Sequence, residues 1–355
     1  MLNNEESYLK GRGAQGNINN KFQNLKYSLE HIEGLDEPFI DEIKTEFIKE
    51  YPKKIISESN SPDLSFVASV NPYHGCEHGC IYCYARNSHE YWGFDAGLDF
   101  ESKIIIKPNA AQLLEQQLNK PNYQPKVILL SGNTDCYQPA ERKFKITRSL
   151  LEVLLKYKHP VSIITKNNLI LRDLDLLQEL NKHDLLHVNI SITSLNEDLR
   201  LKLEPRTVTG KGRLKVVETL AKHDIPVRVM IAPIIPSLNS HEITDIVKVA
   251  ASNGAQAAAF TIVRLNGAIA HIFTDWIAKA FPDAAQKVLH QIQACHDGKL
   301  NDSRWGKRIS GDGIEAQAIH QLFNLAVKKY LKGRSMKIQR LDLFRNDFNR
   351  QTSLF

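Results

Sequence analysis

The chain alternates short, continuous apolar runs with longer stretches in which apolar residues recur at helical spacing. Continuous runs predict strands that are covered on both faces, and they occupy residues 64–70, 104–106, 127–130, 161–164, 188–192, 227–231 and 257–263. Between them, stripes of apolar positions predict amphipathic helices, for example Ile146, Leu150, Val153 and Leu154. Strand–helix alternation of this kind is typical of a parallel sheet.

The helical stripes predict the connections between these strands. Asn109 is expected to cap one helix that ends near residue 118. The others are expected at residues 141–157, around Ile170, Leu174 and Leu177, at 214–223, around Ile246 and Val247, at 276–295 and at 314–331. Counting the run at residues 64–70, we expect six β/α units, which is short of the eight in a closed barrel. The predicted fold class is therefore α/β, with an open, partial (β/α)6 barrel of the TIM type.

Composition divides the chain into four regions. Residues 1–60 are polar and are expected to form an N-terminal arm, and residues 61–268 carry the barrel core. The β/α period stops beyond this core. A helical C-terminal extension is expected over residues 269–335, followed by a basic tail at 336–355.

The composition is that of an ordinary globular enzyme, with 355 residues, 42% hydrophobic and 24% charged. The formal charge of +6 gathers near the end, because residues 328–355 hold eight Lys or Arg and two Asp. Such a segment attracts polyanions, or it is simply solvated. The first residues lack the basic start and apolar core of a signal peptide. The most apolar run, residues 225–235, is too short to span a bilayer. We therefore expect a cytoplasmic protein without a membrane partner.

One short loop carries three of the five cysteines, spaced C-x3-C-x2-C: Cys76, Cys80 and Cys83. Gly75 and Gly79 suit a backbone that wraps closely around a bulky inorganic group. A four-iron cluster normally takes four cysteines, so three thiolates would leave one iron open to another ligand. The alternative is a structural zinc site, which usually closes with four ligands and would take His74 or His78 as the fourth.

Polar or small residues follow the predicted strands, at the end where function gathers in parallel β/α barrels. Residues 131–137 follow the second strand of the barrel, and later strands end at Lys166, Ser191, Ala232 and Arg264. Each segment alone is an ordinary turn or strand end. Together they predict one polar mouth.

The cysteine loop, with Tyr82 before its third cysteine, resembles the signature of the radical S-adenosylmethionine (SAM) superfamily. Within it, the chain is similar to the spore photoproduct lyase-like branch and to an uncharacterised bacterial subfamily, over about residues 10–350. The similar segments are Gly11-Arg12-Gly13-Ala14, Ser88-His89-Glu90-Tyr91, Ala96-Gly97-Leu98-Asp99-Phe100-Glu101, Gly132-Asn133-Thr134-Asp135 and Glu204-Pro205-Arg206. The chain departs from the lyase at Gly132, near the position of the lyase's hydrogen-donating cysteine, and has Cys136 four residues later.

The resemblance implies a [4Fe–4S] cluster on the three cysteines and SAM on the open iron. Reductive cleavage would give methionine and a 5′-deoxyadenosyl radical, with flavodoxin or ferredoxin as the electron donor. The implied SAM contacts are Tyr82 beside the cluster, Gly132, Asn133 and Thr134 at the methionyl amine, Lys166 at the carboxylate, Ser191 at the ribose and the backbone of Ala232 at the adenine. Arg206 and Arg264 are candidates for a substrate phosphate or the SAM carboxylate. The alternatives are solvated or ion-paired side chains and ordinary strand ends.

Cys136 and Tyr137 lie just after the same strand end as Gly132. A thiol or phenol there is a candidate to return a hydrogen atom to a substrate radical. The alternative for Cys136 is a small side chain buried in the core.

Three classes of function remain open. The first is a radical SAM enzyme that abstracts hydrogen from DNA in a repair-like reaction. The second is the same chemistry on a protein or small molecule, and the third is a non-catalytic iron–sulfur protein that binds nucleic acid. The last five residues, Gln351-Thr352-Ser353-Leu354-Phe355, resemble the peptide by which bacterial polymerases and repair proteins dock on the sliding clamp, except that Thr352 replaces the usual Leu. The alternative is a tail folded onto its own barrel.

Overall fold

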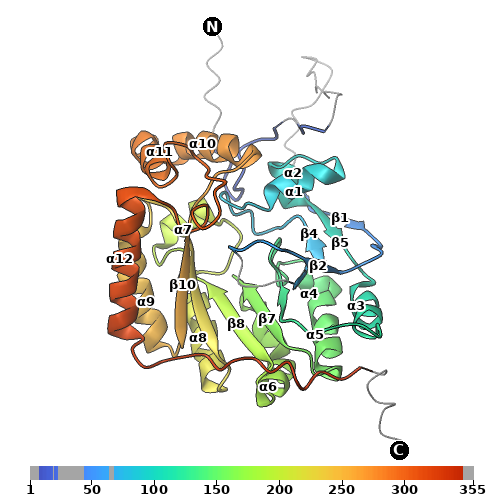
Figure 1. The fold of residues 1–355 in the computed structure, drawn as a ribbon. Coiled ribbons are helices and arrows are strands. Elements are labelled where there is room, and N and C mark those ends of the chain that lie inside the picture. The colour runs from blue at the N-terminus through green and yellow to red at the C-terminus, as the bar shows by residue number, and fades with distance from the viewer. Residues whose placement is uncertain (1–7, 19, 23–43, 64–67, 347–355) are drawn as a thin grey trace, which may run out of the picture.

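The computed structural model describes residues 8–18, 20–22, 44–63 and 68–346. Within them, the main sheet has seven strands in the order β10-β9-β8-β7-β6-β3-β2 (Figure 1). Neighbouring strands from β3 to β10 pair in parallel: β3 (Ala68–Val70), β6 (Ile128–Leu130), β7 (Val161–Thr165), β8 (Leu186–Ser191), β9 (Val227–Ile234) and β10 (Ala257–Ile262). At one edge, β2 (Ile56–Glu58) pairs antiparallel with β3. The edge strands do not pair with each other in the described part of the chain, so the predicted open, partial (β/α)6 barrel is confirmed.

Helices cover the outer face of this sheet (Figure 1). They are α3 (Ala110–Leu118), α5 (Ile146–Lys156), α6 (Leu174–Lys182), α8 (Gly210–Lys222), α9 (Ile243–Ser252) and α12 (Gly313–Tyr330). Residues Ile163, Val188 and Val229 point toward them and are fully buried. Burying one such side chain stabilises the fold by about 1.5–3 kcal/mol.

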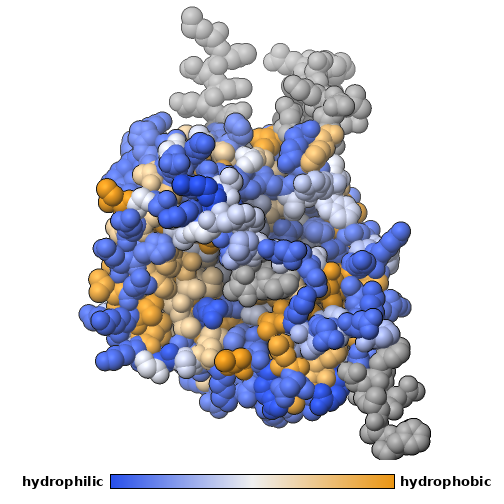
Figure 2. Space-filling model, viewed as in Figure 1, coloured by the Kyte–Doolittle hydropathy of each residue, from blue (hydrophilic) through white to orange (hydrophobic). Residues whose placement is uncertain are grey.

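The strands are covered on one face and only partly on the other. Along β7 and β9, buried residues alternate with half-buried ones, as expected when every second side chain faces an open barrel interior. The prediction of strands fully covered on both faces is therefore wrong for these two. Figure 2 shows apolar surface at the level of β10, where Ala258, Ala259 and Phe260 are only half-buried.

A second, smaller sheet joins the N-terminal region to the cysteine loop. It contains β1 (Glu46–Lys49), β5 (Lys103–Ile106) and β4 (Tyr73–His74), in that order. Three short helices follow the cysteines: α1 (Arg86–His89), η1 (Glu90–Trp92) and α2 (Leu98–Ser102). The polar composition of residues 1–60 gave no sign of β1, which forms by pairing with β5 far along the chain, or of β2, which pairs with the following strand β3.

Several predicted helices are divided. The stretch 141–157 forms α4 (Glu141–Phe144) and α5, because Lys145 between them has a φ of 53°. The stretch 276–295 forms α10 (Ala268–Ala280) and α11 (Ala285–Ala294). Asn109 occupies the predicted N-cap position of α3, which ends at Leu118 as expected, but its side chain makes no capping hydrogen bond. The helix predicted around Ile170, Leu174 and Leu177 is divided into η2 (Asn168–Asp173) and α6. Short segments without a predicted helix form α7 (Glu197–Leu203) and η3 (Ser240–Glu242).

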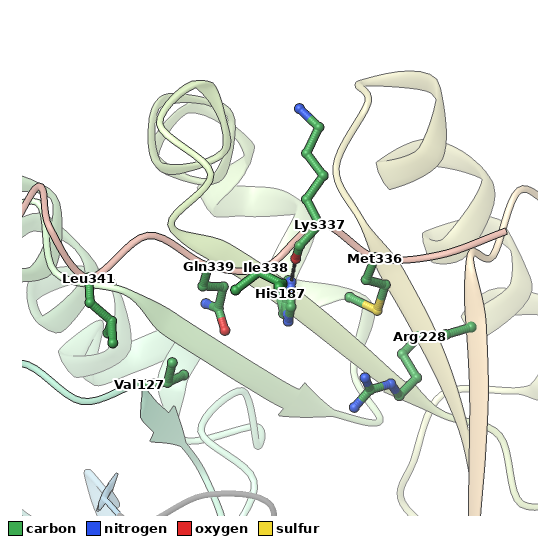
Figure 3. Close-up of a pocket in the computed structure, with 9 residues that line it drawn as sticks. Val127, His187, Arg228, Met336, Lys337, Ile338, Gln339 and Leu341 are labelled. Carbon is green, nitrogen blue, oxygen red and sulfur yellow. Dashed lines mark hydrogen bonds between the residues drawn. The ribbon is translucent and has the colours of Figure 1, made fainter.

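After α12, the chain crosses beneath the barrel at the amino ends of the strands (Figure 1). The Nε2 of Gln339 donates to the carbonyls of Val161 and Leu185, at 2.7 and 2.8 Å. The ring of His187 bonds the carbonyl of Lys337 at 2.7 Å (Figure 3). We call residues 336–346 the floor segment. Residues 347–355, which include the clamp-like peptide, lie outside the described residues.

No helix in the part of the chain that the structure describes is long and apolar enough to cross a membrane.

Candidate active site

The cysteine loop follows β4 of the smaller sheet, near the carboxyl ends of the parallel strands of the main sheet. Backbone contacts hold the loop in place. The N–H of Cys76 donates to the carbonyl of Phe100 at 2.8 Å. Gly75 and Gly79 have φ values of 72° and 67°, in the left-handed region that glycine adopts without strain. A Cβ on Gly79 would lie 2.8 Å from Oε2 of Glu101. The loop therefore requires glycine at both positions.

The three thiols are buried near one another. Cys76 and Cys80 are 7% and 8% exposed, and Cys83 is half-buried. Burial raises the pKa of each thiol. The charge of Cys83 raises the pKa of Cys76 further, and the charges of Cys83 and Cys76 raise that of Cys80. Within the described residues, no group of three or more His, Cys, Asp and Glu is arranged to hold one metal ion. Zinc needs such a set, whereas the thiolates of a cubane bind separate irons, so the donor set fits a cluster better.

Both histidines of the zinc alternative already have partners. His78 lies 3.5 Å from Oδ2 of Asp135 and 3.3 Å from Nδ2 of Asn167. His74 lies 3.3 Å from Nδ2 of Asn133 and stacks on Trp92, with ring centroids 5.5 Å apart. Both ring nitrogens of His78 thus have partners, whereas at His74 the polar contact is at Nδ1.

A fully buried carboxylate, Glu204, lies in the mouth and gathers side chains from several strand ends. It pairs with Arg213, accepts from the Tyr82 hydroxyl, and accepts from Oγ1 of Thr193 at 2.7 Å. The Nζ of Lys166 is 3.9 Å away. Burial opposes the charged form of Glu204, but Arg213 and Lys166 outweigh it and lower its pKa to about 2. Tyr82 and Lys166, two predicted SAM contacts, are thus held by one ionised group. Glu204 belongs to one of the segments that resemble the lyase-like branch, but the sequence indicated no role for it.

A second carboxylate, Asp135, ties two strand ends to the cysteine loop. It accepts from the N–H of Lys166 and from Oγ1 of Thr165, both at 2.8 Å. Its other neighbour is His78, two residues after Cys76. Asp135 belongs to a segment that resembles the lyase-like branch, and its contacts form only in the folded chain.

The predicted segment Gly132–Thr134 lies beside the turn that precedes the cysteines. The side-chain oxygen of Asn71 accepts from the N–H of Asn133 at 2.9 Å, and Oγ1 of Thr134 donates to the carbonyl of Tyr73 at 2.7 Å. Gly132 has a φ of 109°. These residues are therefore next to the loop, and their contact with SAM stays a prediction.

Ser191 and Ala232 lie on neighbouring strands near the carboxyl ends of β8 and β9, and the register pairs Ser191 with Met230, two residues before Ala232. The carbonyl of Ser191 accepts from Nη1 of Arg213 at 3.0 Å, and the carbonyl of Ala232 accepts from Oγ1 of Thr193 at 3.4 Å. Their roles at the ribose and the adenine stay predictions.

The two candidate arginines lie in different places. Arg206 packs against the cysteine loop: its N–H donates to the carbonyl of His78 at 3.3 Å, and Nη2 donates to the carbonyl of Glu101 at 3.2 Å. Arg264 follows β10 and is half-buried near Tyr84 and Arg308. No hydrogen bond or ion pair with another described residue is present at Arg264. It is therefore the better placed of the two to bind an anion.

The loop between α11 and α12 extends across the mouth and contacts residues that follow β2. The Nε of Arg308 lies 2.5 Å from Oδ2 of Asp63, and its Nη2 lies 2.5 Å from Oγ of Ser61. The same guanidinium stacks on Trp305, 3.9 Å from the ring centroid, and this ring is 58% exposed. The sequence showed only a glycine-rich connection here, because Ser61 and Asp63 are about 245 positions away.

Cys136 and Tyr137 lie in the main core and are both fully buried. The N–H of Cys136 donates to Oγ of Ser131 at 3.0 Å, and its carbonyl accepts from Oγ1 of Thr147 at 2.6 Å. The Tyr137 hydroxyl donates to Asp173 at 3.1 Å. This burial favours the packing alternative, and a hydrogen-donor role for either residue stays a prediction.

Known proteins resemble this chain in sequence and in fold. An uncharacterised protein of Mycobacterium tuberculosis is 31% identical over 230 residues, covering 64% of this chain and 68% of the relative. An uncharacterised protein of Methanocaldococcus jannaschii is 31% identical over 195 residues, covering 55% and 70%. Spore photoproduct lyase complexed with dinucleoside spore photoproduct matches in fold, with a TM-score of 0.58, 16% identity and 81% and 80% of the two chains covered. A point mutant of that lyase gives 0.59 at 14% identity, covering 85% and 86%.

The model of the Radical SAM superfamily matches residues 70–250, from the end of β3 to α9. This span includes the cysteine loop, Glu204 and five of the six parallel strands in whole or in part. The non-catalytic alternative is thereby set aside. Because the match covers half of the sequence, the chain belongs to the radical SAM superfamily, and it is an enzyme that uses a [4Fe–4S] cluster and SAM for radical chemistry.

Proposed function

We propose that Cys76, Cys80 and Cys83 hold the cluster, that SAM binds across the mouth, and that the substrate is a nucleic acid. The cluster supplies the electron that cleaves SAM to methionine and a 5′-deoxyadenosyl radical. The loop supports this assignment because its three thiols share one small region and both ring nitrogens of His78 have partners.

The buried charges of the mouth suit the binding of SAM, which carries an ammonium, a carboxylate and a sulfonium. Glu204 keeps Lys166 in place at 3.9 Å, and an ammonium has three donors, so Lys166 retains donors for the SAM carboxylate. Glu204 is ionised and buried, and it therefore also favours positive charge nearby. Gly132, Asn133 and Thr134 would meet the methionyl amine.

The observation that carries the substrate proposal is the rim of the mouth. Trp305 is exposed beside Arg308, and Arg264, which has no ion pair with another described residue, lies near both Arg308 and Tyr84. A base stacked on an aromatic side chain gains about 1–3 kcal/mol, and a guanidinium binds phosphate through two donors. The fold likeness to a lyase solved with dinucleoside spore photoproduct agrees with this reading.

The test is anaerobic reconstitution with dithionite and SAM, measuring 5′-deoxyadenosine with damaged DNA, undamaged DNA and a peptide mixture. We expect damaged DNA to raise the yield. Trp305→Ala and Arg264→Ala should weaken DNA binding and leave uncoupled SAM cleavage unchanged. Ile338→Ala, on the floor segment, is the matched control. Stimulation by peptides but by no DNA would refute the nucleic-acid substrate and leave the cluster assignment intact.

We further propose that residues 351–355 bind a bacterial sliding clamp. These residues lie outside the described part of the chain and follow the floor segment in the sequence. A peptide ending in Gln351–Phe355 should bind a purified bacterial clamp, and Leu354→Ala with Phe355→Ala should abolish that binding. No binding at hundreds of micromolar would remove this partner.

A further inference from the structure

The N-terminal segment 11–18 and 20–22, which we call the strap, lies against the cysteine loop and the helices that follow it. Figure 1 shows it as a dark blue trace beside α1 and α2. At its start, the N–H groups of Gly13 and Ala14 donate to the two carboxylate oxygens of Glu101, at 3.2 and 2.8 Å. Glu101 is fully buried.

The same carboxylate connects the strap to a cysteine. Oε1 of Glu101 pairs with Nη2 of Arg86 at 2.6 Å, and Nε of Arg86 donates to the carbonyl of Cys80 at 3.0 Å. Both side chains of this pair are inaccessible to solvent. Ala14 is likewise fully buried, in one apolar cluster with Cys80 and Tyr82. The strap is therefore part of the packing around the loop.

The fit at Gly13 leaves no room for a side chain. A Cβ there would lie 1.8 Å from the carbonyl oxygen of Gly79, which stands directly before Cys80. Three residues later, a Cβ on Gly16 would meet nothing within 4 Å. Backbone strain does not separate the two positions, because neither has a positive φ. The chain thus offers two glycines that differ in their distance from the loop.

Further contacts hold the rest of the strap. The side-chain oxygen of Asn17 accepts from the N–H of Leu98 at 2.9 Å and of Asp99 at 3.3 Å. The Nδ2 of Asn20 donates to the carbonyls of Glu90 and Phe94, at 3.0 and 2.8 Å. These contacts tie the strap to the segment that follows the last cysteine. They would be lost together if the strap detached.

We propose that the strap is a cover for the cysteine loop, which excludes water and dioxygen from the side of the loop opposite the mouth. Its seat is the buried Glu101–Arg86 pair and the face of Gly79. Protection of a cluster rests on the proposed cluster assignment. Shielding of the three thiols does not depend on it and applies to the cluster-free chain as well.

The test compares Gly13→Ala with the matched control Gly16→Ala. In cluster-free protein, the rate of iodoacetamide labelling is read at each cysteine by mass spectrometry. Gly13→Ala should raise labelling of Cys76, Cys80 and Cys83 by about tenfold, through easier local opening, and Gly16→Ala should match the wild type. Cys136 and Cys295, both fully buried elsewhere, report global unfolding. In reconstituted protein, the cluster absorbance of Gly13→Ala should bleach faster in air.

Equal labelling of the loop cysteines in Gly13→Ala and wild type would overturn the proposal. If labelling of Cys136 and Cys295 also rises in Gly13→Ala, that variant unfolds globally, and Asn17→Ala becomes the deciding variant. Asn17→Ala removes two hydrogen bonds without introducing a steric clash. That variant must then label selectively on the loop, and its failure to do so overturns the proposal. Selective labelling in a protein that takes up no iron would uphold the cover and refute the cluster assignment.

Discussion

The two ends of the barrel are built from different interactions. At the mouth, buried charges hold one another: Glu204 pairs with Arg213 and lies near Lys166. At the floor, the C-terminal segment binds mainly backbone carbonyls, as Gln339 does with Val161 and Leu185. A buried charge is costly unless it is paired, whereas a neutral hydrogen bond contributes about 0.5–1.5 kcal/mol. The buried ion pairs of the mouth therefore carry a desolvation penalty and supply fixed charges suited to chemistry. The neutral hydrogen bonds of the floor segment close the sheet with little such penalty.

The largest expected effect tests whether the mouth is the reaction centre. Replacing Cys76, Cys80 and Cys83 together with Ala should abolish both iron binding and SAM cleavage. Iron content per chain and 5′-deoxyadenosine yield are the measurements. Cys295→Ala, at the end of α11, is the control and should bind iron as the wild type does. A triple variant that still holds about four irons would disprove the assignment.

The next prediction concerns the charge network itself. Glu204→Gln removes the partner of a fully buried arginine, and we expect a loss of about 3–5 kcal/mol in the free energy of unfolding. Urea denaturation at pH 7 measures it. Glu197→Gln changes an ion pair whose carboxylate is 44% exposed and should cost less than about 1 kcal/mol. Equal losses of unfolding free energy in the two variants would contradict the contrast between the buried charges of the mouth and an ordinary surface ion pair.

The floor should respond to acid through His159. This ring is fully buried beside Tyr123 and Phe344, and burial lowers its pKa from 6.5 to about 4. Because the folded pKa is the lower one, its contribution to stability is complete above pH 6.5 and is lost as the pH falls toward 4. The loss amounts to up to about 3 kcal/mol. His159→Gln should flatten the dependence of unfolding free energy on pH over this range, and an unchanged slope would contradict the prediction.

The smallest effect separates the floor from the chemistry. Gln339→Ala deletes two hydrogen bonds to strand-end carbonyls and should cost about 1–2 kcal/mol of stability, with SAM cleavage unchanged. Ile338→Ala, beside it and 91% exposed, should stay within about 0.5 kcal/mol of the wild type. Thermal unfolding and 5′-deoxyadenosine yield are compared for both. A loss of cleavage in Gln339→Ala at full folding would show that the floor is coupled to the mouth.

Much of the barrel could be predicted because its signals are local. Apolar runs gave each parallel strand to within a few residues, and helical stripes gave most helices between them. The breaks within predicted helices were not visible: Lys145 adopts a left-handed φ in a stretch whose apolar period continues through it. The cysteine loop was identified for the same local reason, since its three thiols and two glycines lie within nine positions, from Gly75 to Cys83.

The sequence by itself determined the superfamily, the six-unit barrel and the side of the sheet on which function gathers. Only the tertiary structure decided the partners: Glu204 with Lys166, Arg308 with Asp63, and Gly13 with Gly79. Periodicity and spacing report interactions between residues a few positions apart. A buried ion pair or a close backbone approach depends on distances between segments that meet only when the sheet curls, and no local pattern records these distances.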